Sequence, residues 1–96
     1  MNRDYALVCV GEGWGKLINN LYDAKLKKVQ VLDVKERFGG FRFYCSASVP
    51  EWYLDLTEYY EEKSLHICEN CGNDGKQKTI NGWIKTLCEE CLRTEE

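Results

Sequence analysis

The sequence of 96 residues contains few of the side chains that most enzymes use for acid–base or nucleophilic chemistry. His66 is its only histidine, so there is no H-E-x-x-H metal motif, and any Ser/His/Asp set would depend on that one residue. The chain also has a single proline and no low-complexity run, and its hydrophobic content of 44% is sufficient for a folded core. These features predict a non-catalytic globular protein.

The sequence also lacks any apolar stretch long enough to span a bilayer. The apolar run at residues 5–10 is too short, and too poorly flanked, for a signal peptide. We therefore expect a cytoplasmic protein. A chain of this length is expected to form one small domain, in which extra cross-links are valuable for stability.

A surplus of positive charge is absent as well, since the formal net charge is −3. A protein that binds the DNA backbone in a general way is usually basic, so this charge counts against such a function. The charge is uneven along the chain: residues 1–47 carry +3 and residues 48–96 carry −6. Any site for an anion is therefore expected in the first half.

Cysteine is the residue type that the chain has in excess, with six in a short sequence. Four of them form two C-x-x-C pairs, sixteen residues apart: Cys68, Cys71, Cys88 and Cys91. Two such turns joined by a hairpin can hold four thiolates tetrahedrally at about 2.3 Å from a zinc ion, which predicts one structural Zn²⁺ per chain. The alternative is four reduced or disulfide-paired cysteines. Four thiolates leave no position open for water, so chemistry at the metal is not expected.

The remaining candidate nucleophiles and ligands have simpler interpretations. Cys9 and Cys45 lie in apolar runs without a basic neighbour, which indicates core residues. His66 is better explained as a residue at a helix end than as a zinc ligand. The acidic run of Glu58, Glu61 and Glu62 is most simply a solvated helix face.

Apolar periodicity predicts the elements of the first half. Residues 5–10 fit a buried strand, although a run this short is also compatible with a helical turn, and residues 17–26 fit an amphipathic helix. Residues 29–38 and 41–48 alternate as two strands joined by a turn at Gly39-Gly40. Ser48 and Glu51 have the spacing of a capping box for a second helix that ends near residue 65, with residues 52, 56, 59 and 63 on one stripe.

The predicted first hairpin generates a hypothesis about binding. A turn at Gly39-Gly40 pairs Arg37 with Arg42, and like charges placed opposite each other destabilise a hairpin unless an anion lies between them. Lys35, Arg37, Arg42 and Tyr44 would then form an anion- or nucleotide-binding surface, with a solvated face as the alternative. Glu36 falls on the apolar face, where it either pairs with a buried Lys or Arg or marks a face that is not fully covered, and we favour the pair.

A second candidate feature is the glycine-rich loop at residues 11–15, which lacks the spacing of a phosphate-binding signature and is better explained as a turn. Its Trp14 is either a core anchor or a stacking surface, and Trp83 is a further candidate for ligand contact. In the second half, Asn81-Gly82 between residues 76–80 and 83–88 is a strong hairpin signal. Together with the cysteine pairs, this is the layout of a zinc ribbon.

Three segments also carry a resemblance to a known family: Gly13-Trp14 with Leu17-Ile18, VKERFGGFRFY at residues 34–44, and the Cys-x-x-Cys-Gly ribbon with GWIKTLC at residues 82–88. They resemble a family of small uncharacterised proteins, found largely in bacteriophages and prophages, that has a VKE(R/K)FGG(F/L)RFY hairpin and a C-terminal four-cysteine zinc ribbon. The resemblance covers nearly the whole chain. It implies a viral origin and a zinc ribbon, but no catalytic residues.

The predicted fold is α+β in a small single domain. Residues 1–66 form a core of N-terminal segment, helix, hairpin and helix, and residues 67–96 form the zinc ribbon on the same core. The leading function hypothesis is a host-takeover or counter-defence factor that sequesters a phosphorylated or nucleotide ligand in the host cytoplasm as a homo-oligomer. The alternatives are an inhibitor of a host protein and an adaptor for nucleic acid or a transcription complex. The locally basic Lys76, Lys78 and Lys85 favour the adaptor, and the acidic net charge disfavours bare nucleic acid.

Overall fold

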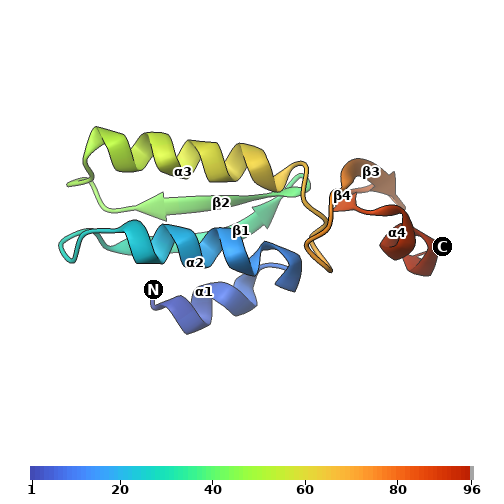
Figure 1. Ribbon diagram of the computed structural model, residues 1–96, viewed down its shortest axis with the longest axis horizontal. Helices are drawn as coiled ribbons and strands as arrows, with labels where there is room; N and C mark the ends of the chain where they lie inside the picture. The colour runs from blue at the N-terminus through green and yellow to red at the C-terminus, as the bar shows by residue number, and fades with distance from the viewer. Residues whose placement is uncertain (96) are drawn as a thin grey trace.

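The computed structural model describes residues 1–95 and has an α+β fold of extents 44 × 22 × 22 Å, in agreement with the predicted class. The first hairpin and three helices form one end of the molecule, and the second hairpin with a short last helix forms the other (Figure 1). In chain order the elements are α1 (Arg3–Cys9), the 3-10 turn η1 (Glu12–Trp14), α2 (Gly15–Ala24), β1 (Val31–Arg37), β2 (Gly40–Cys45), α3 (Glu51–Ser64), β3 (Lys76–Ile80), β4 (Trp83–Leu87) and α4 (Glu89–Glu95). Within the described residues, no helix is both long and apolar enough to cross a membrane.

The predicted strand at residues 5–10 is wrong, because this segment is helix α1. Asn2 caps the helix, and its side-chain oxygen accepts a hydrogen bond from the Tyr5 N–H at 2.8 Å. The N-terminal amino group donates to the Val31 carbonyl at 2.8 Å, which ties the start of the helix to β1. A short apolar run does not distinguish strand from helix, and here the N-cap and the packing against α2 decide.

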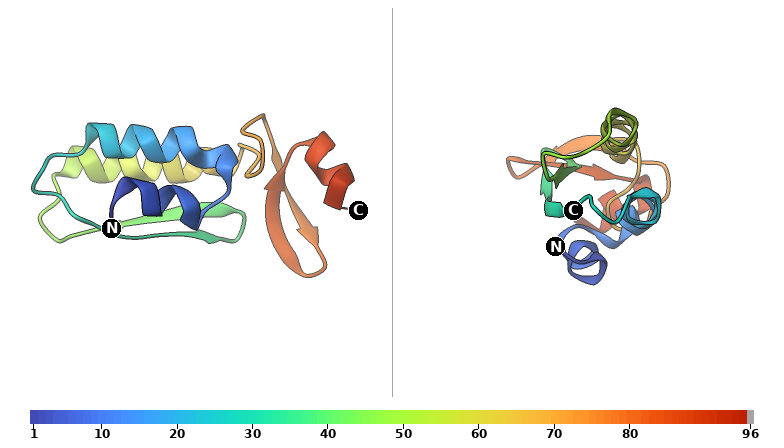
Figure 2. Two further views of the ribbon diagram at one scale, coloured as in Figure 1. Left: turned by 90° about the horizontal axis from the view of Figure 1, so that it is seen from below. Right: turned by 90° about the vertical axis from the view of Figure 1, so that its left-hand side faces the viewer.

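The core lies between the first hairpin and the helices α1, α2 and α3, which all lie on one side of it (Figure 2). Helix α2 occupies the predicted segment and buries Leu17, Ile18, Leu21 and Tyr22. The hairpin contributes Val34, Phe41 and Phe43 from its inner face. Tyr53 of α3 is fully buried, and its hydroxyl donates to the Leu21 carbonyl at 2.6 Å, so that α2 and α3 are joined by a hydrogen bond inside the core.

Helix α3 was predicted in the right place with the wrong face. The side chains it buries are Tyr53, Thr57 and Ser64, whereas Trp52 and Tyr59 of the predicted stripe are exposed. The capping box is also wrong, since Pro50 is the N-cap and no side chain bonds to the first turn. The two neighbouring stripes of the helix carry equal numbers of aromatic residues, Trp52 and Tyr59 against Tyr53 and Tyr60, so the sequence of the helix alone does not reveal which one faces the hairpin.

The first hairpin turns at Phe38-Gly39, not at Gly39-Gly40, with φ of 54° and 82°. Arg42 therefore pairs with Lys35, and Arg37 pairs with Gly40, so the predicted pairing of Arg37 with Arg42 is wrong. Gly40 is the first residue of β2. A side chain is disfavoured at this position because a Cβ there would lie 2.7 Å from the Leu65 side chain. The correction moves every partner by two positions, so Val34, Phe41 and Phe43 still face inward.

A bulge at the start of β1 changes which of its side chains face the core. The register shifts between Val31 and Asp33, which turns Val31 into the core and leaves Leu32 exposed. Phe38, also predicted on the apolar face, is exposed because it lies in the turn.

The outer edge of β2 is blocked by side chains of α3. The Phe41 N–H donates to the Ser64 hydroxyl at 3.1 Å, and the Phe43 N–H donates to a Glu61 carboxylate oxygen at 2.8 Å. Glu61 is therefore not part of a solvated face, and only 17% of its side chain is exposed. This edge cannot pair with another strand while α3 is in place.

Burial raises the pKa of the Glu61 carboxyl, and the Phe43 N–H and Arg42 oppose this effect. Because the folded protein then holds the proton more tightly than the unfolded chain, stability falls as the pH rises from the ordinary value of 4.5 through the folded-state pKa. Glu61→Gln keeps an acceptor for Phe43 and removes the titration. We expect the free energy of unfolding of this variant, relative to wild type, to increase over that pH interval in urea denaturation of the zinc-loaded proteins. Glu58→Gln is the matched control with an exposed carboxyl, and an equal pH dependence in both variants would contradict the expectation.

Candidate metal centre and the surfaces around it

The structure brings the four cysteines of the two C-x-x-C pairs together at one end of the molecule. Their sulfur atoms, from Cys68, Cys71, Cys88 and Cys91, all lie within 4.8 Å of one another. A tetrahedral zinc site with Zn–S distances of about 2.3 Å has sulfurs about 3.8 Å apart. The Cys71 and Cys88 sulfurs are 3.6 Å apart, so the cluster is positioned to bind a metal ion and is compatible with structural zinc.

Two backbone turns position these thiols. In the first, Gly72 has φ of +85°, and its N–H donates to the Cys68 carbonyl at 3.0 Å, which closes the turn between the ligands. In the second, Cys88 follows β4 and Cys91 lies in α4, with the Cys91 N–H 3.5 Å from the Cys88 sulfur. Helix α4 was not predicted from the sequence, although Glu89 and Glu90 are suited to a first helical turn.

The pKa values of the Cys68 and Cys91 thiols are shifted in opposite directions. Burial raises the pKa of the Cys68 thiol, but the amides of Cys88, Cys71 and Asn70 hydrogen-bond to its sulfur and lower the pKa to about 6. The neighbouring Cys88 and Cys68 thiols raise the pKa of Cys91 to about 12. These pKa values hold for the thiols without a metal ion. A dication at their centre would allow all four thiols to ionise.

The glycine-rich loop at η1 is packed against the first cysteine turn. The Gly13 N–H donates to the Glu69 carbonyl at 2.8 Å, and the Trp14 indole N–H donates to the Ile67 carbonyl at 2.9 Å. A Cβ on Gly13 would overlap the Cys68 carbonyl oxygen, so the glycine permits the two backbones to approach. The loop therefore binds protein backbone, and the backbone of the cysteine turn occupies the space that a phosphate would take in a phosphate-binding loop.

Trp14 is therefore a core residue. Its side chain is 0% exposed and contacts Phe41 edge to face at 6.0 Å between ring centroids. The ring is not accessible as a stacking surface, which corrects its assignment as a ligand-binding residue.

A second contact joins the two hairpins. Gln77 of β3 donates through its side-chain amide to the Phe38 carbonyl at 2.9 Å, and the Thr86 hydroxyl of β4 donates to the Gly39 carbonyl. The Glu69 N–H in turn donates to the Thr86 carbonyl at 2.9 Å. One face of the second hairpin thus rests on the turn of the first.

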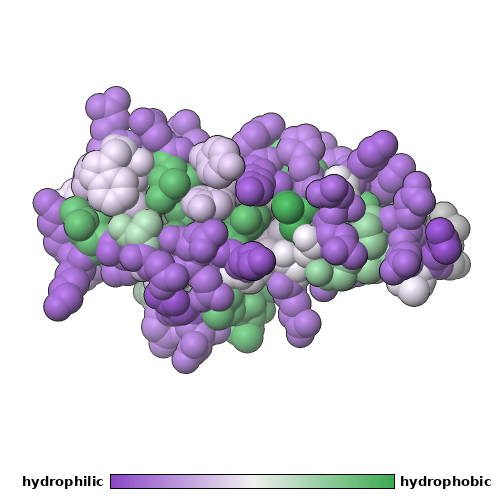
Figure 3. Space-filling model, in the orientation of Figure 1, coloured by the Kyte–Doolittle hydropathy of each residue, from purple (hydrophilic) through white to green (hydrophobic). Residues whose placement is uncertain are grey.

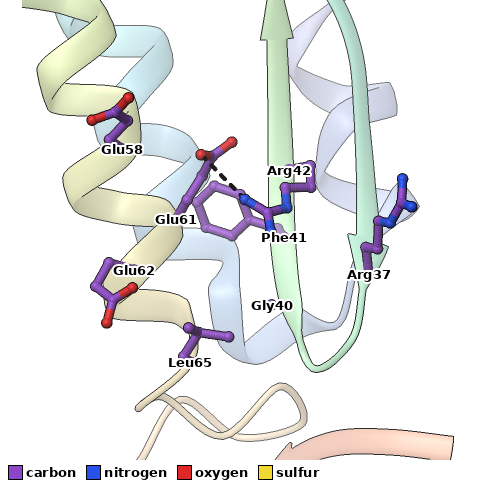
Figure 4. A pocket seen from close by; sticks show the side chains of 8 residues that line it. All are labelled: Arg37, Gly40, Phe41, Arg42, Glu58, Glu61, Glu62 and Leu65. Carbon is purple, nitrogen blue, oxygen red and sulfur yellow. Dashed lines mark ion pairs between the residues drawn. The ribbon is translucent and has the colours of Figure 1, made fainter.

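The residues predicted to bind an anion lie on the outer face of the first hairpin, where Arg37, Arg42 and Tyr44 line one cavity of about 510 Å³ together with carboxylates of α3. Lys35 lies over the Tyr44 ring, with its ammonium 5.5 Å from the ring centroid. Arg42 extends toward Glu61, with 3.9 Å between guanidinium and carboxylate, whereas Arg37 points away from α3 (Figure 4). Glu36, predicted to pair with a buried cation, is exposed and accepts a hydrogen bond from the Gly39 N–H at 3.1 Å.

A cavity of about 310 Å³ lies between β2 and α3, and both Arg37 and Arg42 line it. Three carboxylates of α3 line it as well: Glu58, Glu61 and Glu62. Sequence reasoning did not connect this acidic run with the arginines, although its helical spacing could have suggested a face directed at β2. The cavity is of mixed charge, which is unfavourable for a ligand with several negative charges.

The second hairpin has another face, opposite the one that contacts the first hairpin. Cross-strand pairing places Lys78 beside Lys85 and Ile80 beside Trp83, and Lys76 lies on the same face. Trp83 is 73% exposed, so it remains accessible as predicted. We call Lys76, Lys78, Ile80, Trp83 and Lys85 the ribbon face.

Substitution of one clustered cysteine tests the metal centre. Purified protein should contain one zinc per chain by elemental analysis, and Cys71→Ser should reduce this content to near zero. Structural zinc contributes about 10–16 kcal/mol in small zinc-finger peptides, so a chelator should unfold at least the second hairpin of the wild type. Cys9→Ser, outside the cluster, should retain the metal; full zinc content in Cys71→Ser would contradict the assignment.

Two glycines of the same loop test its contact with the cysteine turn. Gly13→Ala should lower the free energy of unfolding by about 3 kcal/mol, the upper end of the range for overpacking, because the methyl group meets backbone. Gly15→Ala is the matched control, since its Cβ would meet only the Leu7 side chain at 3.8 Å and Gly15 is already helical. Equal stabilities in chemical denaturation would show that the contact is not as close as described.

Comparisons with known proteins do not add an assignment to this geometry. No protein-family model, no curated protein and no solved structure matches the chain. The functional argument therefore depends on the metal centre and on the surfaces that it holds in place.

Proposed function

We propose that this protein is a non-catalytic, zinc-stabilised adaptor that binds an acidic surface of a macromolecular partner through the ribbon face. The observation that carries the proposal is the gathering of Lys76, Lys78 and the exposed Trp83 on one face of the second hairpin. Two lysines on an exposed strand attract the carboxylates of a partner. An exposed tryptophan beside them supplies apolar contact area at the same surface.

The metal centre and the other thiols support a role without catalysis. Four cysteine ligands would close the zinc shell to water and substrate. Burial raises the pKa of the Cys45 thiol, and Glu61 raises it further, so this cysteine is less nucleophilic than a free one. The metal would instead stabilise the small fold that presents the ribbon face.

Capture of a phosphorylated ligand by Lys35, Arg37, Arg42 and Tyr44 is the second candidate. It is favoured by the pairing of Lys35 with Arg42 on an exposed face. The three glutamates of α3 and the direction of Arg37 oppose it. For this reason we place it after the adaptor function.

The biological setting in this proposal comes from the resemblance to phage and prophage proteins. In that setting the partner is a host protein or a complex such as the transcription machinery, and the adaptor acts in host takeover or counter-defence. The surface in Figure 3 is hydrophilic over most of the second hairpin, with hydrophobic patches along the junction of α3 and the first hairpin. A mixed surface of this kind suits reversible association with a partner.

Retention experiments with surface variants test the proposal. Zinc-loaded wild type is immobilised and the proteins and nucleic acids that it retains from bacterial lysate are quantified. We expect Lys78→Glu and Trp83→Ala each to reduce the principal retained species by roughly tenfold, because the charge or the apolar contact is lost. The double variant Arg37→Ala/Arg42→Ala is the matched control and should retain it.

The opposite result supports the second candidate. The adaptor proposal fails if two results are obtained together. The first is that Arg37→Ala/Arg42→Ala loses the principal retained species while Lys78→Glu keeps that species. The second is that cyclic dinucleotides or ADP-ribose derivatives raise the melting temperature of the wild type.

A further inference from the structure

Strand β3 has an open edge. Ile80 and Trp83 flank the two-residue turn at Asn81-Gly82, whose φ values are 52° and 85°, so the two residues form a hydrogen-bonded pair. Alternation along an antiparallel ladder then directs the N–H and C=O groups of Gln77 and Thr79 outward. Within residues 1–95 neither amide N–H donates to another residue, and both residues are exposed.

The same alternation gives the correct result on β2 and β4. In β2 it directs the Phe41 and Phe43 amides outward, and these donate to Ser64 and Glu61 of α3. In β4 it directs the Thr86 carbonyl outward, and this carbonyl accepts from the Glu69 N–H. The fold therefore covers both outward amides of β2 and bonds β4 at Thr86, whereas both outward amides of β3 are exposed and, within residues 1–95, donate to no other residue.

A cavity of about 300 Å³ adjoins this open edge, between β3 and α4. Leu87 and Leu92 provide its apolar lining, and Lys76 and Lys78 line it from β3. Lys76 and Leu87 are cross-strand partners, so the cavity opens on the ribbon face. Asp74, Glu89 and the cysteine Cys88 line the end next to the metal centre.

We propose that β3 accepts an extended acidic segment of a partner protein as an added strand. Backbone groups of the segment would bond to Gln77 and Thr79, an apolar side chain would enter the cavity at Leu87 and Leu92, and its carboxylates would lie beside Lys76 and Lys78. This inference rests on the adaptor function and specifies the chemistry of the partner.

The charges around the cavity favour such a segment over nucleic acid. A nucleic acid backbone is negative along its whole length, and it would meet Asp74, Glu89 and the net charge of four thiolates on one zinc ion. A peptide can carry carboxylates beside the lysines and apolar side chains at the cavity. Strand pairing also uses outward backbone groups that phosphates do not need.

The test uses zinc-loaded full-length protein and a short acetylated peptide in which glutamate and valine occupy positions i and i+2 in turn, with threonine between them, so that both side chains fall on the face of Lys76 and Lys78. We expect the amide NMR signals of Gln77 and Thr79 to shift on titration and their hydrogen exchange to slow at saturation. Thr79→Pro removes one outward N–H at an edge position that tolerates proline and should weaken binding by roughly tenfold or more. Thr79→Ala, which keeps the N–H, is the matched control and should bind like the wild type. Zinc content and the amide spectrum verify that each variant is folded.

Each outcome separates the two proposals. Strand addition is excluded if Thr79→Pro binds the peptide as well as Thr79→Ala does, or if the amides of Gln77 and Thr79 show no protection from hydrogen exchange. The adaptor function would still stand in that case, provided that Lys78→Glu abolishes retention from lysate. If duplex DNA with steep salt dependence, and not the peptide, perturbs the lysine signals, the partner is nucleic acid and the inference fails. Loss of lysate retention in Thr79→Pro but not Thr79→Ala would extend the result from the peptide to the natural partner.

Discussion

The structure depends on one contact, in which the η1 loop meets the first cysteine turn. Gly13 donates its N–H to the Glu69 carbonyl, and the Trp14 indole donates to the Ile67 carbonyl. Trp14 belongs at the same time to the main core through Phe41. A chain this short buries a limited apolar area, and the contact connects that core to a centre where a metal ion can act as an additional cross-link. Together with the hydrogen bonds of Gln77 and Thr86 to the turn of the first hairpin, it positions the second hairpin.

Hydrogen-bonding groups of neighbouring elements also cover parts of the strand edges. A two-stranded sheet is marginal alone and has two edges, each of which can pair with another chain. Helix α3 covers the edge of β2 with Ser64 and Glu61, at the cost of burying a carboxyl whose pKa rises. The cysteine turn covers the edge of β4 through Glu69. An edge that remains open in such a molecule is a candidate for use, which is the basis of the inference about β3.

The charge of each surface region depends on which side chains the fold places next to one another. Arg42 appeared in the sequence as half of an arginine pair, but in the fold it faces Glu61 and the acidic run of α3. The lysines of the second hairpin come from the more acidic half of the chain, yet pairing collects three of them on one face with Trp83. Net charge by halves therefore did not locate the surface that is most suited to an acidic partner.

The sequence by itself determined the features that depend on local spacing. The four cysteines, the Asn81-Gly82 turn and the periodicity of α2 are patterns within a few residues, and they predicted the metal cluster, the second hairpin and the first-half helix. The inward positions of Val34, Phe41 and Phe43 also followed, since the alternation of side chains survives a register change of two positions, whereas the bulge and the turn left Leu32 and Phe38 exposed. Only the tertiary structure decided that residues 3–9 form a helix, that the turn lies at Phe38-Gly39, and that Trp14 is buried. The reason is that each of these depends on a distant partner: α2 and Val31 for the helix, Leu65 for Gly40, and the Ile67 carbonyl for Trp14.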